Sequence, residues 1–156
     1  MEGGRGGPPD KPIIDPSQGP SWDRAQDLFR GRNPPSGTST WIAFLEGTAG
    51  QDSQLLGRAL GDRQVVMIPV VLTELLSDPA LSSGVAETLS EIPMIELEPG
   101  YWQRAGLLRS KVLSMRKARL GDALIAQNCI DRGIALLTRD NDFRAFSDAA
   151  QLNLVP

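Results

Sequence analysis

The sequence predicts a single α/β domain with three α/β/α layers, in which helices flank a short central parallel sheet. Short apolar runs rich in Val, Ile and Leu alternate along the chain with longer segments of helical periodicity. These apolar runs contain few polar residues, which is typical of strands that are covered on both faces. A chain of 156 residues with a hydrophobic fraction of 40% is long enough to bury one substantial core.

Helices and strands are expected to alternate from residue 38 to the end of the chain. Apolar residues at helical spacing predict helices over 38–47, 53–62, 70–79, 83–92, 101–115 and 121–133. Apolar, largely β-branched runs predict strands over 64–69, 94–98, 134–138 and, more weakly, 152–155. Thr38 or Ser39 is expected to cap the first helix, and Gly133 is expected to end the last one.

The first 37 residues have a different composition. Residues 1–11 are polar and rich in glycine, so we expect a disordered tail before a domain at residues 12–156. The stretch "KPIID" is a short apolar run that ends in the carboxylate of Asp15. Residues 16–37 are rich in Pro, Gly and Ser, and within them Ser21 can cap a short amphipathic helix.

The composition excludes several kinds of functional site. The chain contains no histidine and one cysteine, Cys129, which rules out a Ser-His-Asp triad, an imidazole metal site and a structural zinc cluster. Neither of the common nucleotide-binding glycine motifs is present. No apolar run approaches the ~20 residues of a membrane span. We therefore expect a protein of the reducing cytoplasm that does not enter a membrane.

Four carboxylates are placed where a parallel sheet and its helices could bring them together. Asp140 and Asp142 follow the predicted strand 134–138 at its carboxyl end, where sites in such sheets lie. Asp122 stands in the first turn of a helix, and Glu74 stands among leucines and valines. Each has an ordinary explanation: turn formation for the first two, helix-end electrostatics for Asp122, and a surface position or an Arg partner for Glu74.

Four stretches together resemble a PIN-domain ribonuclease, most closely the VapC-type toxins of bacterial toxin–antitoxin pairs. They are "TSTWIAFLEG", "PVVLTELLSD", "GDALIAQNCIDRGIALLTRDNDF" and "LNLV", in order over residues 38 to 156. The resemblance implies a Mg²⁺- or Mn²⁺-dependent endoribonuclease, a cognate antitoxin as partner, and a homodimer. It implies the following residues: catalytic Asp15, Glu74, Asp122 and Asp140; metal ligands Asp15, Asp122, Asp140 and Asp142; supporting hydroxyls Thr38 and Ser39.

The sequence departs from the family pattern at the first of these acids. In the family the first acid stands immediately before the "TS" helix, but here that position is Gly37. A proline- and glycine-containing stretch such as "PPSG" is not expected to form a buried central strand. We therefore interpret residues 16–37 as an insertion directly after Asp15. The alternative is that Asp15 belongs to the tail and the first acid has been lost.

The chemistry of the predicted site follows from its donor atoms. Carboxylates without soft ligands favour a hard cation, Mg²⁺ or Mn²⁺, although an acidic pocket could also hold one structural cation. A run of cations with no acid among them precedes Asp122 and could bind RNA phosphates, or could be a solvated helix face. It contains Arg109, Lys111, Arg116, Lys117 and Arg119.

Two functions of different classes remain on this reasoning. The first is a metal-dependent endoribonuclease, a hydrolase whose activity is impaired if the insertion displaces the first acid. The second is a catalytically impaired PIN scaffold that binds an antitoxin or RNA without efficient cleavage. The position of Asp15 relative to Glu74, Asp122 and Asp140 would distinguish them.

Overall fold

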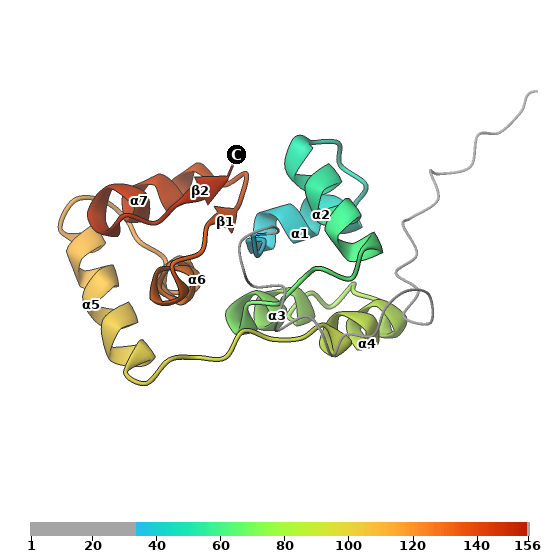
Figure 1. Ribbon diagram of the computed structural model, residues 1–156, viewed down its shortest axis with the longest axis horizontal. Coiled ribbons are helices and arrows are strands. Elements are labelled where there is room, and N and C mark those ends of the chain that lie inside the picture. Colours follow the sequence, from blue (N-terminus) through green and yellow to red (C-terminus); the bar gives the residue numbers. More distant parts are fainter. Residues whose placement is uncertain (1–33, 156) are drawn as a thin grey trace, which may run out of the picture.

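A computed structural model describes residues 34–155, in which helices predominate. Residues 1–33, and with them Asp15 and the predicted helix after Ser21, lie outside the described residues. The helices are α1 (Thr38–Leu45), α2 (Gln51–Gly61), α3 (Pro69–Leu76), α4 (Ser83–Glu91), α5 (Tyr101–Leu113), α6 (Leu120–Arg132) and α7 (Arg144–Ala150), with a 3-10 turn η3 at Asn141–Phe143. Figure 1 shows α5, α6 and α7 at one end of the view, and α1 to α4 at the other.

A small parallel sheet lies between these two groups of helices (Figure 1). Strand β1 (Leu136–Leu137) pairs in parallel with β2 (Leu154–Val155). A further parallel bridge joins Met67 to Met94, within the two segments that were predicted as strands 64–69 and 94–98. Among the described residues the strands are therefore shorter than predicted, but the pairing is parallel as expected.

The other edge of β1 is occupied by the segment that leads into α1. Ser36 forms a parallel bridge with Leu137, and it is only 2% exposed. The Leu137 N–H donates to the Pro35 carbonyl, and the Gly37 N–H donates to the Leu137 carbonyl, both at 2.9 Å. As expected, "PPSG" does not form a central strand: it makes an isolated bridge at the edge of the sheet, where Pro35 offers β1 only its carbonyl and needs no N–H.

The apolar faces of the helices meet in one core beside the sheet. The largest side chains that are almost fully buried include Trp41, Tyr101, Phe146 and Met67. Cys129 is fully buried in α6, and burial raises the pKa of its thiol to about 12, so the thiol stays protonated as a core residue. The architecture is the predicted α/β fold, with more helix and less strand than the apolar runs indicated.

Two local predictions need correction. Helix α7 was not expected, because its short sequence "RAFSDAA" follows the turn-forming "RDNDF" and carries only a weak apolar pattern. The first helix is not capped by Thr38 or Ser39, since its N-cap residue is Gly37 and no side chain caps it. The Thr38 hydroxyl is used elsewhere, as described below. No helix of the described residues is both long and apolar enough to cross a bilayer.

Candidate functional site

Glu74 is held by contacts with two neighbouring helices. It belongs to α3, and its Oε2 accepts a hydrogen bond from the Thr38 hydroxyl at the start of α1. On its other side it lies against Gly121 of α6, where a Cβ atom would stand only 2.5 Å from Glu74 Oε1. The glycine thus allows α6 to bring its first turn close to the Glu74 carboxylate. This close approach explains why Gly121 precedes Asp122.

Asp122 is the most buried carboxylate of the site. It lies in the first turn of α6 and is 9% exposed. Burial and the negative charge of Asp140 raise its pKa from 3.8 to about 6, with further contributions from Glu74 and Asp142, while Arg119 acts in the opposite direction. The carboxylates predicted from the sequence are therefore near enough to affect one another electrostatically.

The turn after β1 presents Asp140 and Asp142. The Asp140 N–H donates to Thr138 Oγ1 at 3.1 Å, and Asp140 Oδ1 accepts from the Asp142 N–H at 2.9 Å. Thr138 Oγ1 also lies 3.4 Å from the hydroxyl of Ser39. One oxygen of Asp140 thus fixes the turn, as the ordinary reading of a turn residue predicts. The sequence reasoning overlooked Thr138, a polar residue that ends an apolar strand at the sheet's carboxyl edge.

An ion pair between the buried Asp52 and the more exposed Arg139 anchors the same turn to α2. Arg139 donates from Nε and one NH₂ group to the two carboxylate oxygens of Asp52, at 2.8 and 2.7 Å, and to the Ser53 hydroxyl at 3.0 Å. Asp52 also accepts from the Thr40 hydroxyl at 2.8 Å. The Arg139 guanidinium holds the pKa of Asp52 down at about 2. Since Arg139 stands between Thr138 and Asp140, this pair fixes where the acidic turn lies relative to α1 and α2.

The strand position immediately before Thr38 carries no acid. Gly37 occupies it, in an ordinary extended conformation with φ −70° and ψ 165°. A Cβ atom there would lie 3.3 Å from Thr138 Oγ1, a close but adjustable contact. Residues 35–37 were predicted to be part of the insertion, yet they occupy the edge of the sheet. Asp15, the expected first acid, lies outside the described residues.

The expected catalytic and metal-binding acids of the described residues have donor atoms that suit a divalent cation, but they do not converge on one point. Glu74, Asp122, Asp140 and Asp142 offer only oxygen donors, which suits Mg²⁺ or Mn²⁺. Within residues 34–155, however, no three acidic or cysteine side chains converge closely enough to hold a metal ion. Among these described residues, the position immediately before Thr38 adds no carboxylate, because Gly37 stands there.

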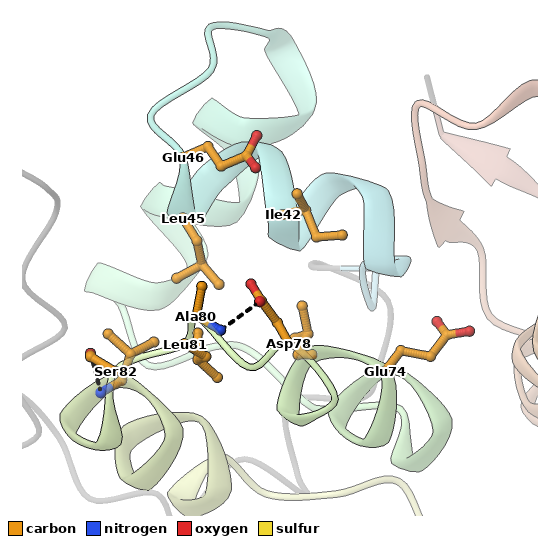
Figure 2. Close-up of a pocket in the computed structure, with 10 residues that line it drawn as sticks. Ile42, Leu45, Glu46, Glu74, Asp78, Ala80, Leu81 and Ser82 are labelled. Carbon is orange, nitrogen blue, oxygen red and sulfur yellow. Dashed lines mark hydrogen bonds between the residues drawn. The ribbon is translucent and has the colours of Figure 1, made fainter.

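One side of the acidic site opens into a groove between α1, α3 and α4, hereafter the α1–α3–α4 groove. Its volume is about 420 Å³. Figure 2 shows Ile42, Leu45 and Leu81 lining it and the Glu74 carboxylate pointing away from these apolar side chains. Its remaining charged lining residues are acidic, Glu46 and Asp78. The groove is therefore apolar with a negative rim.

The other side opens into a basic hollow between the end of α5 and the start of α6, hereafter the α5–α6 pocket. Its volume is about 510 Å³. Its lining residues are Arg109, Leu113, Lys117, Ala118, Arg119, Asp122 and Asp142. Three of the five cations predicted to bind RNA thus lie beside two of the predicted acids. Arg116 is exposed but is not part of the lining.

Lys111, the fifth predicted cation, has another role. Its Nζ donates to the Ala149 carbonyl and so ties α5 to α7. Helix α5 is also fixed to α6, because Arg104 makes a bidentate pair with Asp131 at 2.8 and 2.6 Å. The Tyr101 hydroxyl donates to the Leu124 carbonyl at 2.7 Å. These bonds set the position of α5 against α6 and hence the shape of the α5–α6 pocket.

One range of the chain matches a known family. It contains the acids and hydroxyls described above and the lining residues of both hollows. The PIN domain family model matches residues 38–149. A search among curated proteins finds no match. The matched range covers most of the 156 residues and contains Thr38, Glu74, Asp122, Asp140 and Asp142. The chain therefore belongs to the PIN domain family, whose members are generally nucleases that use divalent metal ions.

Proposed function

We propose that the protein is an endoribonuclease that hydrolyses RNA phosphodiester bonds with Mg²⁺ or Mn²⁺, at a rate limited by the lack of an acid immediately before Thr38. The observation that carries the proposal is the meeting of three elements at one point. The Glu74 carboxylate receives the Thr38 hydroxyl and lies against Gly121, next to the buried Asp122. Carboxylates that only stabilised helix ends or turns would not need to lie close to one another where α1, α3 and α6 meet.

The residues that would hold the cation are Glu74, Asp122, Asp140 and Asp142. A divalent cation bound there would supply an acidified water and would neutralise charge on the phosphodiester during in-line attack. Glu74 is oriented by the Thr38 hydroxyl, which removes one rotational freedom from the carboxylate. Asp140 is oriented by the N–H of Asp142.

The proposed partners follow from the family resemblance and are supported by the α1–α3–α4 groove. A cognate antitoxin in the cytoplasm would restrain the nuclease by placing an apolar helix in this groove, which combines Ile42, Leu45 and Leu81 with an acidic rim. A basic side chain on that helix would complement Glu46 and Asp78. We further propose a homodimer, which the family resemblance implies.

A second candidate function is a PIN scaffold that binds an antitoxin or RNA without efficient cleavage. Gly37 favours it, because the strand position before Thr38 lacks the carboxylate that the family pattern places there. Losing one anionic ligand weakens a carboxylate metal site, since affinity for hard cations depends on the charge of the ligands.

A cleavage assay with a matched set of variants tests the nuclease. The full chain is incubated with single-stranded RNA in Mn²⁺ and in EDTA, beside Glu74→Gln, Asp122→Asn and Asp148→Asn, an exposed acid of α7. We expect Mn²⁺-dependent cleavage that falls by about 100-fold or more in the first two variants and is unchanged in the third. Equal cleavage by all four proteins would contradict the proposal, and Mn²⁺-independent RNA binding without cleavage would favour the scaffold.

A further inference from the structure

Charge is divided across the acidic site. On one side the α1–α3–α4 groove carries no cation among its lining residues, and its charged members are Glu46, Glu74 and Asp78. On the other side the α5–α6 pocket combines Asp122 and Asp142 with the three cations Arg109, Lys117 and Arg119. A polyanion that reaches the acids therefore meets attraction on one side and repulsion on the other.

Arg109 is presented to the pocket in a fixed position. Its Nε donates to the Ala118 carbonyl at 3.1 Å, which bridges the end of α5 to the segment before α6. Among the described residues its two NH₂ groups donate to no protein acceptor, so they remain for a ligand. A guanidinium held in this way loses little conformational entropy when it binds an anion, and its fork suits phosphate oxygens.

The other two cations frame the same hollow from the chain segment between α5 and α6. Lys117 and Arg119 both line the pocket, and Arg119 is near enough to Asp122 to oppose the rise in its pKa. Leu113 adds an apolar wall. A hollow of about 510 Å³ whose lining combines three cations with Leu113 is large enough to hold a nucleotide.

We propose that the α5–α6 pocket is a phosphate subsite for the nucleotide next to the scissile bond, so that the RNA strand runs across this pocket and not through the α1–α3–α4 groove. The subsite rests on the proposed function and specifies its substrate: an RNA strand with at least one phosphate beyond the one that is cleaved. It also separates the five predicted RNA-binding cations. Arg109, Lys117 and Arg119 bind the phosphate, whereas Arg116 and Lys111 do not.

Lys117 and Arg116 form a matched pair for the test. They are neighbours in the chain, both exposed and both cationic, but only Lys117 lines the pocket. Binding of a fluorescein-labelled single-stranded RNA to the full chain is measured by anisotropy in EDTA, where cleavage does not interfere. We expect Lys117→Ala and Arg109→Ala each to weaken binding about three- to tenfold, and Arg116→Ala to weaken it less than about twofold.

A second variant and the salt dependence guard against misfolding. Arg109→Lys keeps the charge but not the guanidinium fork, so it should bind between the parent and Arg109→Ala. Each lost phosphate contact should reduce the slope of log K against log salt by about 0.7. The subsite proposal would be overturned if Arg116→Ala weakened RNA binding as much as Lys117→Ala does. It would also be overturned if none of these variants changed the RNA affinity.

Cleavage separates failure of the subsite from failure of the nuclease. In Mn²⁺, a trinucleotide should be cleaved about tenfold faster than a dinucleotide with a single phosphate, and Lys117→Ala should remove most of that difference. Selective binding without any cleavage would leave the subsite standing and refute the nuclease. Cleavage at equal rates for both lengths, unchanged in Lys117→Ala, would refute the subsite and leave the nuclease standing.

Discussion

The α1–α3–α4 groove and the α5–α6 pocket lie beside different carboxylates of the acidic site and differ in the charge of their lining residues. The groove is lined by aliphatic side chains and has an acidic rim, whereas the lining of the pocket includes three cations. Glu74 belongs to the lining of the groove, and Asp122 and Asp142 belong to the lining of the pocket. The two hollows therefore meet at the acids from opposite sides.

This difference indicates a division of labour around one site. An apolar groove with negative charge suits a basic amphipathic helix, which can bury side chains and neutralise the rim. A basic pocket suits phosphate and excludes such a helix. On the proposed function, a protein regulator and a nucleic-acid substrate would reach the acidic site by separate routes, so that one need not resemble the other.

The ion pair between Arg139 and Asp52 holds the acidic turn against α2, and removing it should lower the free energy of unfolding more than any other change considered. Arg139 and Asp52 tie the turn that carries Asp140 to the helix pair α1–α2 on the groove side. Because the Asp52 side chain is only 7% exposed, Arg139→Ala leaves a buried carboxylate without its partner. We expect the free energy of unfolding to fall by about 2–3 kcal/mol, measured by urea titration.

The matched control for this variant is Arg58→Ala, an exposed arginine of α2. It should change the free energy of unfolding by less than about 0.5 kcal/mol. If Arg139→Ala were no more destabilising than Arg58→Ala, the position of the acidic turn would not depend on its ion pair with α2.

The second prediction uses the pH dependence of stability to test whether the charge on Asp122, which lines the pocket, destabilises the folded state. The pKa of Asp122 rises from 3.8 to about 6 in the folded state, so the folded state binds the proton more tightly than the unfolded state. Its contribution to stability is present below pH ~4 and is lost as the pH rises through ~6. At pH 8 without metal, Asp122→Asn should therefore stabilise the protein by about 1–2 kcal/mol, after the loss of a favourable first-turn charge.

Thermal melts at pH 5 and pH 8 with and without Mn²⁺ check this. The variant should melt higher than the parent at pH 8, by about half as much at pH 5, and should gain less from Mn²⁺. A parent chain whose stability rises between pH 5 and 8 relative to Asp122→Asn would show that the Asp122 charge is favourably paired, and the repulsive acidic site would be wrong.

The smallest effect is expected on the groove. Asp78 lies on its rim, and Asp78→Asn keeps the acceptor that receives the Ala80 N–H at 2.8 Å while removing the charge. Since RNA is proposed to avoid this groove, its affinity should change by less than about twofold at ~0.15 M salt, where distant exposed charges are screened. An RNA affinity gain as large as the loss in Lys117→Ala would place both hollows on the nucleic-acid path.

The sequence predicted the helices of this fold better than its strands. The runs 101–115 and 121–133 are long and periodic, and they became α5 and α6 nearly as expected, with Gly133 ending α6. Strands in so short a sheet depend on distant partners, and the pairing of Ser36 with Leu137 spans most of the domain. The stretch "PPSG" has no strand-like sequence pattern that would predict this pairing. The pairing needs only two backbone hydrogen bonds to Leu137, which do not depend on the side chains.

The candidate site shows the same limit. Glu74, Asp122, Asp140 and Asp142 could be chosen from residue type and from their places in predicted elements. Three contacts could not be predicted, because they join residues that are far apart in the sequence. They are the hydrogen bond from Thr38 to Glu74, the close approach of Gly121 to Glu74, and the hydrogen bond from Lys111 to the Ala149 carbonyl. Excising residues 16–37 to test the insertion would remove the segment that pairs with β1.

Restoring an acid at position 37 tests most directly the claim that Glu74, Asp122, Asp140 and Asp142 form a metal site that lacks one carboxylate. Gly37 has an extended backbone, and the nearest neighbour of an added Cβ is the Thr138 hydroxyl at 3.3 Å, so a side chain can be accommodated by a small shift. Mn²⁺ affinity is measured by calorimetry for the parent, for Gly37→Asp and for the uncharged control Gly37→Asn. We expect Gly37→Asp to bind Mn²⁺ about tenfold more tightly than Gly37→Asn, because only the aspartate adds an anionic ligand. Equal Mn²⁺ affinity of the two folded variants would contradict the account.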